Sequence, residues 1–140
     1  ILRYDIPYGP GMRSNMAIDI FVRKAMKKQP ITIYGDGNQG RCFIYVEDLA
    51  EGNVAALQEK GKNQIFNLAG REFITMNQIV EQLREIFGRI EAVYDLKRAQ
   101  DFKGVQVDIS KAKKFLGWEP TRPFQESLRK YIEYIQYSEK

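Results

Sequence analysis

The chain has no histidine and one cysteine, so its chemistry must rest on other side chains. Without histidine, His-based catalytic triads, His general bases and nearly every zinc site are excluded. Asp, Glu, Tyr, Lys and Arg remain as the groups that could act on a substrate. The lone Cys42 cannot form an intrachain disulfide, which fits a reducing compartment.

Charged residues in two irregular segments are the first candidates for a site. Arg41 follows a turn-rich loop, and Arg98 opens an Arg-x-x-Asp segment that ends at Asp101. Taken alone, these residues fit a solvated surface better than a site, because charged side chains in loops are common.

The loop from Gly35 to Gly40 spells G-x-G-x-x-G, the pattern of a dinucleotide-binding turn. That turn requires a helix to open within it, so that a pyrophosphate lies at the helix N-terminus. Here the next segment is Phe43-Ile44-Tyr45-Val46, which favours a strand. We therefore interpret the loop as a turn between two strands and not as a phosphate cradle.

Composition indicates a folded, globular chain with dispersed charge. The 140 residues are 44% hydrophobic, 12% aromatic and 29% charged, and 22 Lys+Arg against 18 Asp+Glu give a net charge of +4. No apolar run approaches the roughly 20 residues of a membrane span, so no membrane partner is expected. The cations do not gather in one region, so no nucleic-acid partner is expected either.

Hydrophobic spacing and turn signals predict an alternation of strands and helices, and hence an α/β fold. The segments expected as strands are 1–4 (buried), 31–34, 42–46, 64–68 and 90–96, and the segment 7–11 is expected as a loop. The segments expected as helices are 15–28 with Ser14 as cap, 47–59 with Leu49, Ala50, Val54 and Leu57 inward, 75–88 with a Thr75–Gln78 capping box, 110–117 capped by Ser110, and 125–137. A single domain over 1–140 is expected, and because it begins inside a strand the chain looks like part of a longer one.

Five sequence blocks, in order, carry a resemblance to a known family. They are Leu2-Arg3-Tyr4 with Tyr8-Gly9-Pro10, Pro30 to Gly37, Arg41 to Asp48, Asp108 to Lys113, and Leu116 to Pro120. Together they resemble the C-terminal, substrate-binding part of extended short-chain dehydrogenase/reductases, the NAD-dependent nucleotide-sugar epimerases and dehydratases. The resemblance implies small mixed sheet segments packed with about five helices, with the Rossmann half that binds NAD missing from this chain.

The resemblance also implies roles for individual residues. Arg41 and Arg98 would clamp the substrate diphosphate, to which guanidinium groups are well suited, and Asp101 would contact the ribose. The remaining implied positions are Asn15 and Met16 near phosphate oxygens at a helix start, Thr32 and Tyr34 in the base pocket, and Tyr4 near the nicotinamide of NAD. Such enzymes are cytoplasmic, bind a UDP- or dTDP-sugar and usually form homodimers.

Two departures and one absence limit what is expected of this chain. Asp5-Ile6 stands where the family usually has an Asn two residues after Arg-Tyr, and Ala99-Gln100 replaces a rigid Pro-Gly turn. No tyrosine has a lysine four positions on, so the Tyr-x-x-x-Lys acid/base pair of the family is absent from the chain. The chain is thus expected to bind a nucleotide sugar without catalysing a reaction alone. The alternative is a stand-alone binding or regulatory module without turnover.

Overall fold

The computed structural model describes residues 1–97 and 103–138, which divide into two compact units. The first unit comprises Ile1–Pro10, Cys42–Phe73 and Gln106–Lys140, and the second comprises Gly11–Arg41 and Ile74–Val105. The prediction of a single domain over 1–140 stays a prediction. The described elements include five α-helices and four small two-stranded sheets, which confirms the expected α/β composition.

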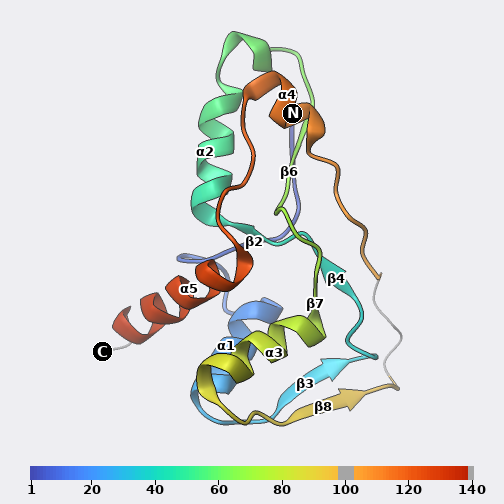
Figure 1. The fold of residues 1–140 in the computed structure, drawn as a ribbon, viewed down its shortest axis with the longest axis vertical. Helices are drawn as coiled ribbons and strands as arrows, with labels where there is room; N and C mark the ends of the chain where they lie inside the picture. The colour runs from blue at the N-terminus through green and yellow to red at the C-terminus, as the bar shows by residue number, and fades with distance from the viewer. Residues whose placement is uncertain (98–102, 139–140) are drawn as a thin grey trace. The chain divides into compact units, whose positions relative to one another are not determined.

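The first unit contains two parallel strand pairs and three α-helices (Figure 1). Its strands are β1 (Leu2–Tyr4), β2 (Pro7–Tyr8), β5 (Ile44–Tyr45) and β6 (Phe66–Leu68); its helices are α2 (Val46–Ala56), a 3-10 turn η1 (Glu59–Gly61), α4 (Ser110–Leu116) and α5 (Phe124–Ser138). β1 pairs with β6, and β2 pairs with β5.

The second unit contains one parallel and one antiparallel strand pair with two helices (Figure 1). Its elements are α1 (Ala17–Met26), β3 (Ile31–Tyr34), β4 (Gly40–Arg41), β7 (Ile74–Thr75), α3 (Met76–Phe87) and β8 (Ala92–Asp95). β3 runs parallel to β8, and β4 runs antiparallel to β7.

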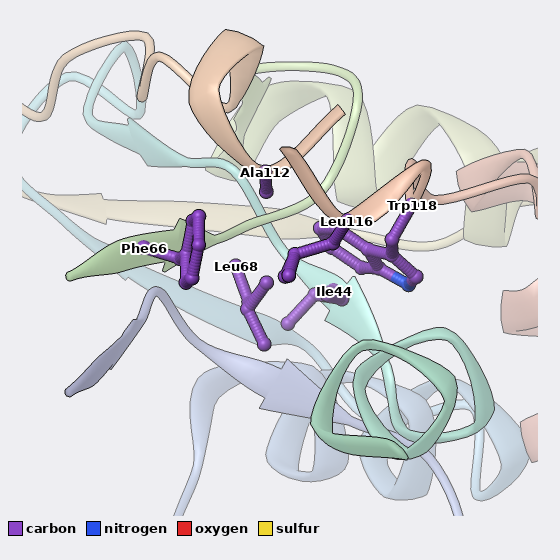
Figure 2. Packing of buried hydrophobic residues seen from close by; sticks show 6 residues of the cluster. All are labelled: Ile44, Phe66, Leu68, Ala112, Leu116 and Trp118. Atoms are coloured by element: carbon purple, nitrogen blue, oxygen red, sulfur yellow. The ribbon is translucent and has the colours of Figure 1, made fainter. Parts of the chain in front are cut away.

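A hydrophobic cluster holds the first unit together, with its residues drawn from β5, β6 and α4 and the segment after α4. Figure 2 shows Leu116 and Trp118 reaching toward Ile44 and Leu68. The buried members are Ile44, Phe66, Leu68, Ala112, Leu116 and Trp118. Each large apolar side chain buried here contributes about 1.5–3 kcal/mol to folding before chain entropy is subtracted.

The core of the second unit lies where α1 and α3 face β3. The buried apolar positions recur at helical spacing on the two helices and alternate on the strand. They are Ile18, Phe21, Val22, Ala25, Ile31, Ile33, Ile79, Val80 and Leu83. The alternation on β3 leaves Thr32 and Tyr34 more exposed than Ile31 and Ile33, which matters for the site.

The Thr75–Gln78 capping box is confirmed at the start of α3. The Thr75 hydroxyl oxygen accepts from the Gln78 N–H at 3.2 Å, and the Gln78 side chain accepts from the Thr75 N–H at 2.8 Å. The helix ends at Gly88 with φ of 81°, a conformation that favours glycine.

The caps predicted for two other helices are wrong. α1 begins after Met16, and no side chain caps it, so Ser14 lies outside the helix. In α4, Ser110 is the first helical residue, and its N–H is bound by the Asp108 carboxylate at 2.8 Å. Asp108 therefore caps the start of α4 in place of Ser110, because its carboxylate reaches the backbone N–H of the residue two positions later, which has no partner within the helix.

Of the inward face predicted for α2, Leu49 packs against the hydrophobic cluster as expected, but Ala50, Val54 and Leu57 are exposed. Val54 is 68% exposed and Leu57 86% exposed, whereas Asp48 and Gly52 are buried. A Cβ on Gly52 would lie 2.9 Å from the Trp118 ring, so α2 approaches Trp118 through the one residue without a side chain.

The first strand and the following loop differ from expectation as well. β1 is not buried as predicted: Leu2 packs partly buried against the hydrophobic cluster, whereas Arg3 and Tyr4 are exposed. Pro7 and Tyr8 form a short strand pair with β5 instead of a loop. Proline is tolerated there because it stands first in the strand, where no N–H need enter the ladder.

Candidate functional site

The second unit contains a cavity of about 350 Å³ between α1 and β3. Its lining brings together three residues predicted from sequence, Asn15, Thr32 and Tyr34. The remaining lining residues are Ala17, Ile20, Phe21, Lys24, Ile33, Gln39 and Met76. A cavity lined by apolar side chains with a few polar groups is the usual form of a small-molecule site.

The start of α1 forms one end of this cavity. Asn15 is exposed and lines the cavity, and Met16 is the N-cap residue without a side-chain cap. The first N–H groups of a helix have no intrahelical partner, and with the helix dipole they favour an anion. Met16 itself is not among the residues that line the cavity.

The edge of β3 that faces away from β8 forms a wall. The Ile31 N–H donates to Glu91 O at 2.9 Å, and the Gly35 N–H donates to Asp95 O at 2.9 Å. Since backbone groups alternate along a strand, those of Thr32 and Tyr34 point to the other edge. Gln39 Nε2 donates to Tyr34 O there at 2.5 Å, and Gln39 lines the cavity.

Asn77, in the first turn of α3, holds the loop from Gly35 to Gly40. Its N–H donates to Gly37 O at 3.1 Å, and its Nδ2 donates to Asp36 O at 3.1 Å. The Met76 N–H donates to Gln39 O at 3.1 Å. The interpretation as a turn between strands is therefore confirmed, and the N-terminal N–H groups of α3 bind loop carbonyls rather than a phosphate.

Arg41 lies in β4, directly after this loop. It is half-buried, its Nη1 donates to Gly40 O at 2.7 Å, and it pairs with Ile74 of β7. It is not among the residues that line the cavity. The other predicted clamp residue, Arg98, and the predicted ribose contact, Asp101, lie outside the described residues.

Tyr4, predicted near the nicotinamide, belongs to the first unit. Its hydroxyl donates to Asn53 Oδ1 at 2.6 Å, and its ring is half-exposed. This bond ties β1 to α2 and fixes the direction of the tyrosine ring.

Asp5 departs from the family pattern, and the structure gives it a local role. Its carboxylate accepts the Cys42 N–H at 2.8 Å, so Asp5 satisfies a backbone donor within the first unit. The Cys42 sulfur accepts the Val107 N–H at 3.4 Å. Burial raises the pKa of the Cys42 thiol, so it is a weak nucleophile.

The sequence analysis missed an ion-pair network around Asp48. This carboxylate is 1% exposed, and it accepts from Arg122 Nη1 at 2.5 Å and from the Thr121 N–H at 3.2 Å. Glu47 and Glu51 each pair with Arg122 at 2.8 Å. The sequence shows acidic residues at a helix start, but only the fold reveals that Arg122, 74 residues later, meets them.

Lys24 and Gln39 also line the cavity, although they are not among the residues predicted from the sequence. Helical spacing offered a signal for the first, because Ala17, Phe21 and Lys24 are separated by four and three residues and share one face of α1. No sequence pattern indicates that Gln39 lines the cavity, because its position depends on how the loop from Gly35 to Gly40 folds.

Residues 1–97 and 103–138 contain neither a metal-binding cluster nor a membrane-spanning helix. No group of three or more Cys, Asp and Glu side chains is placed to hold a metal ion. Within the same residues, no helix combines the length and the apolar character that crossing a membrane requires.

Comparisons with known proteins identify relatives of nearly the whole chain. Residues 1–69 match the model of the NAD dependent epimerase/dehydratase family. The UDP-glucuronate 4-epimerase of Thermodesulfobacterium geofontis is 39% identical over 134 residues, which are 94% of this chain and 41% of that protein.

Two solved structures have the same fold. The UDP-glucose 4-epimerase of Thermotoga maritima with UDP-glucose matches with a TM-score of 0.91 and 34% identity, over 99% of this chain and 46% of that one. The UDP-glucuronic acid 4-epimerase of Bacillus cereus in complex with UDP-glucuronic acid and NAD gives 0.89 and 32%, over 98% and 45%. The chain spans less than half the length of these relatives.

Proposed function

Because the chain belongs to the NAD dependent epimerase/dehydratase family, we propose that residues 1–140 bind the nucleoside diphosphate of a UDP- or dTDP-sugar for an enzyme of this family. One observation carries the proposal. Asn15 lies just before α1, and Thr32 and Tyr34 lie in the block from Pro30 to Gly37. All three are assigned to the substrate by the resemblance, and all three line a single cavity in the second unit.

The proposed nucleotide lies along α1 and β3. The phosphates lie toward Asn15 and Met16, where the free N–H groups of α1 favour negative charge. The base lies toward Thr32 and Tyr34. Arg41 and Arg98 are proposed to clamp the diphosphate with guanidinium N–H groups, and Asp101 is proposed to accept from a ribose hydroxyl.

NAD is the cofactor that the family name implies, and it supplies hydride chemistry when bound. The described residues do not fit a dinucleotide cradle, because the carbonyls of the G-x-G-x-x-G loop bind the N–H groups that begin α3. Tyr4 is the one residue of this chain that we propose to approach the nicotinamide. Proton and hydride transfer fall to groups outside residues 1–140, which contain no Tyr-x-x-x-Lys pair.

A second candidate function is nucleotide-sugar binding without turnover, as a binding or regulatory module. The lack of a Tyr-x-x-x-Lys pair in residues 1–140 supports this alternative as well as it supports the first proposal. Turnover of a UDP-sugar by protein expressed from the complete coding sequence would exclude this alternative.

A cytoplasmic location, a homodimeric enzyme and the lack of a nucleic-acid partner also stay predictions.

Filling the cavity tests the proposal by isothermal titration of UDP into protein expressed from the complete coding sequence. Ala17 lines the cavity and begins α1, and Ala17→Leu introduces a larger side chain that a helix accepts. We expect at least a tenfold loss of UDP affinity, by about 1.4 kcal/mol or more. The matched control is Ala50→Leu on the exposed side of α2. Equal UDP binding by Ala17→Leu and wild type would overturn the proposal.

A further inference from the structure

Lys24 places a cation in the wall of the cavity at a position that no part of the proposed function uses. It is half-buried on α1 and lines the cavity together with Thr32 and Phe21. Among residues 1–97 and 103–138, no carboxylate forms an ion pair with its ammonium group. A cation that lines a cavity without a protein partner is available to a ligand.

Its place along α1 separates Lys24 from the phosphate end of the cavity. Lys24 lies seven residues beyond Ala17, which corresponds to about 10 Å along the helix axis. The connection over residues 27–30 then reverses the chain, so that β3 returns along α1 (Figure 1). Lys24 therefore lies toward Thr32, whereas Asn15 and Ala17 lie toward Tyr34 and Gln39.

The polar groups at the Lys24 end have a defined hydrogen-bonding character. A lysine ammonium donates and cannot accept. The N–H and C=O groups of Thr32 point to the edge of β3 that no described strand covers. This end of the cavity therefore offers donors beside acceptors, with the one charged group a donor.

On this basis we propose that Lys24 selects the base of the nucleotide by donating to the carbonyl oxygen at C4, so that the cavity takes uracil or thymine in preference to cytosine. This inference rests on the proposed function. Uracil and thymine carry a carbonyl oxygen at C4 next to a ring N–H, so they accept from Lys24 and donate to a neighbouring carbonyl oxygen. Cytosine carries an amino group at C4, which cannot accept from an ammonium group.

The cost of a wrong base follows from the same geometry. With cytosine bound, the Lys24 ammonium would lose solvent and face a second donor. A buried polar group left without a partner loses more than a hydrogen bond contributes on average. Selectivity through one charge-assisted hydrogen bond is therefore expected to reach about tenfold or more.

The test compares UDP and CDP by isothermal titration into protein expressed from the complete coding sequence. We expect the wild type to bind UDP at least about tenfold more tightly than CDP. Lys24→Met keeps the length and helix propensity of the side chain and removes the donor, so UDP affinity should fall about tenfold while CDP affinity is unchanged. Lys24→Arg should keep the preference for UDP. The control is Lys60→Met in the exposed 3-10 turn η1.

The possible failures can be told apart. If the wild type binds neither UDP nor CDP, the proposed function fails and this inference fails with it. If the wild type binds UDP and CDP equally, or if Lys24→Met weakens both equally, nucleotide binding stands and base selection by Lys24 is wrong. Equal binding of UDP and CDP by the wild type overturns the inference even where Lys24→Met does not fold.

Discussion

The side chain of Asn77 occupies the space in which any side chain at Gly37 would lie, since a Cβ built on Gly37 falls 2.1 Å from Asn77 Oδ1. The Asn77 N–H donates to Gly37 O at 3.1 Å, and the Tyr94 hydroxyl donates to Asn77 Oδ1 at 2.9 Å. One asparagine thus connects the loop, α3 and β8, and the path of the chain toward Arg41 depends on it.

Replacing Gly37 tests this contact. Gly37 has φ of 77°, and Gly37→Ala adds backbone strain of about 1–2 kcal/mol to a clash with Asn77. The matched control is Gly11→Ala, because Gly11 has φ of 82° and nothing within 4 Å of its Cβ position. In urea unfolding, Gly37→Ala should cost at least about 1 kcal/mol more than Gly11→Ala. Equal losses would mean that Asn77 does not hold the loop as described.

The network around Asp48 should dominate the stability of the first unit. Asp48→Ala removes a buried carboxylate that binds Arg122 and the Thr121 N–H, and we expect a loss of about 3 kcal/mol or more. Glu51→Ala removes an exposed partner of the same Arg122 and should cost about 1 kcal/mol at most. Thermal unfolding measures both variants. Similar small losses would show that the buried and the exposed pair are equivalent.

Alkaline conditions should destabilise the protein through Tyr8. Burial raises the pKa of this hydroxyl above its ordinary value of about 10, and its ring is 1% exposed. Above pH 10 the unfolded chain therefore binds fewer protons than the folded one, so the free energy of unfolding falls as pH rises. Tyr8→Phe should show a smaller fall between pH 9 and about 11 in urea titrations.

The control for that titration is Tyr137→Phe, since the Tyr137 ring is 84% exposed. Its curve should follow the wild type. If Tyr8→Phe loses stability as steeply with rising pH as the wild type does, deprotonation of Tyr8 is not coupled to unfolding.

Cys42 should react slowly in the folded protein. Its thiol is buried, and that burial raises its pKa, so both access and the thiolate fraction are low. We expect iodoacetamide at pH 8 to modify the native protein at least about 100-fold more slowly than the urea-unfolded chain. Mass spectrometry follows the reaction, and equal rates in the two states would contradict the buried position.

Local patterns predicted the elements that local chemistry determines. Thr75 and Gln78 lie three residues apart and form their capping box without help from the rest of the chain. The G-x-G-x-x-G loop was interpreted correctly, because the next apolar run does not have helical spacing. For α2 the pattern failed, since Gly52 and the distant Trp118 decide which face is buried.

The site was predictable in part for the same reason. The family resemblance assigns Asn15, Thr32 and Tyr34 to the substrate, and these residues meet in one cavity. Gln39 reaches the cavity only because the loop folds back so that its amide donates to Tyr34 O. Arg122 reaches Asp48 across 74 positions of the chain. Contacts of this kind depend on the folded topology, which residue spacing does not contain.

The most direct test of the central claim is a crystal structure of the protein, expressed from its complete coding sequence, with UDP. We expect electron density for the nucleotide in the cavity between α1 and β3, with the base beside Lys24 and Thr32 and the phosphates toward Asn15. Density for UDP at another place, while this cavity holds only solvent, would contradict the account.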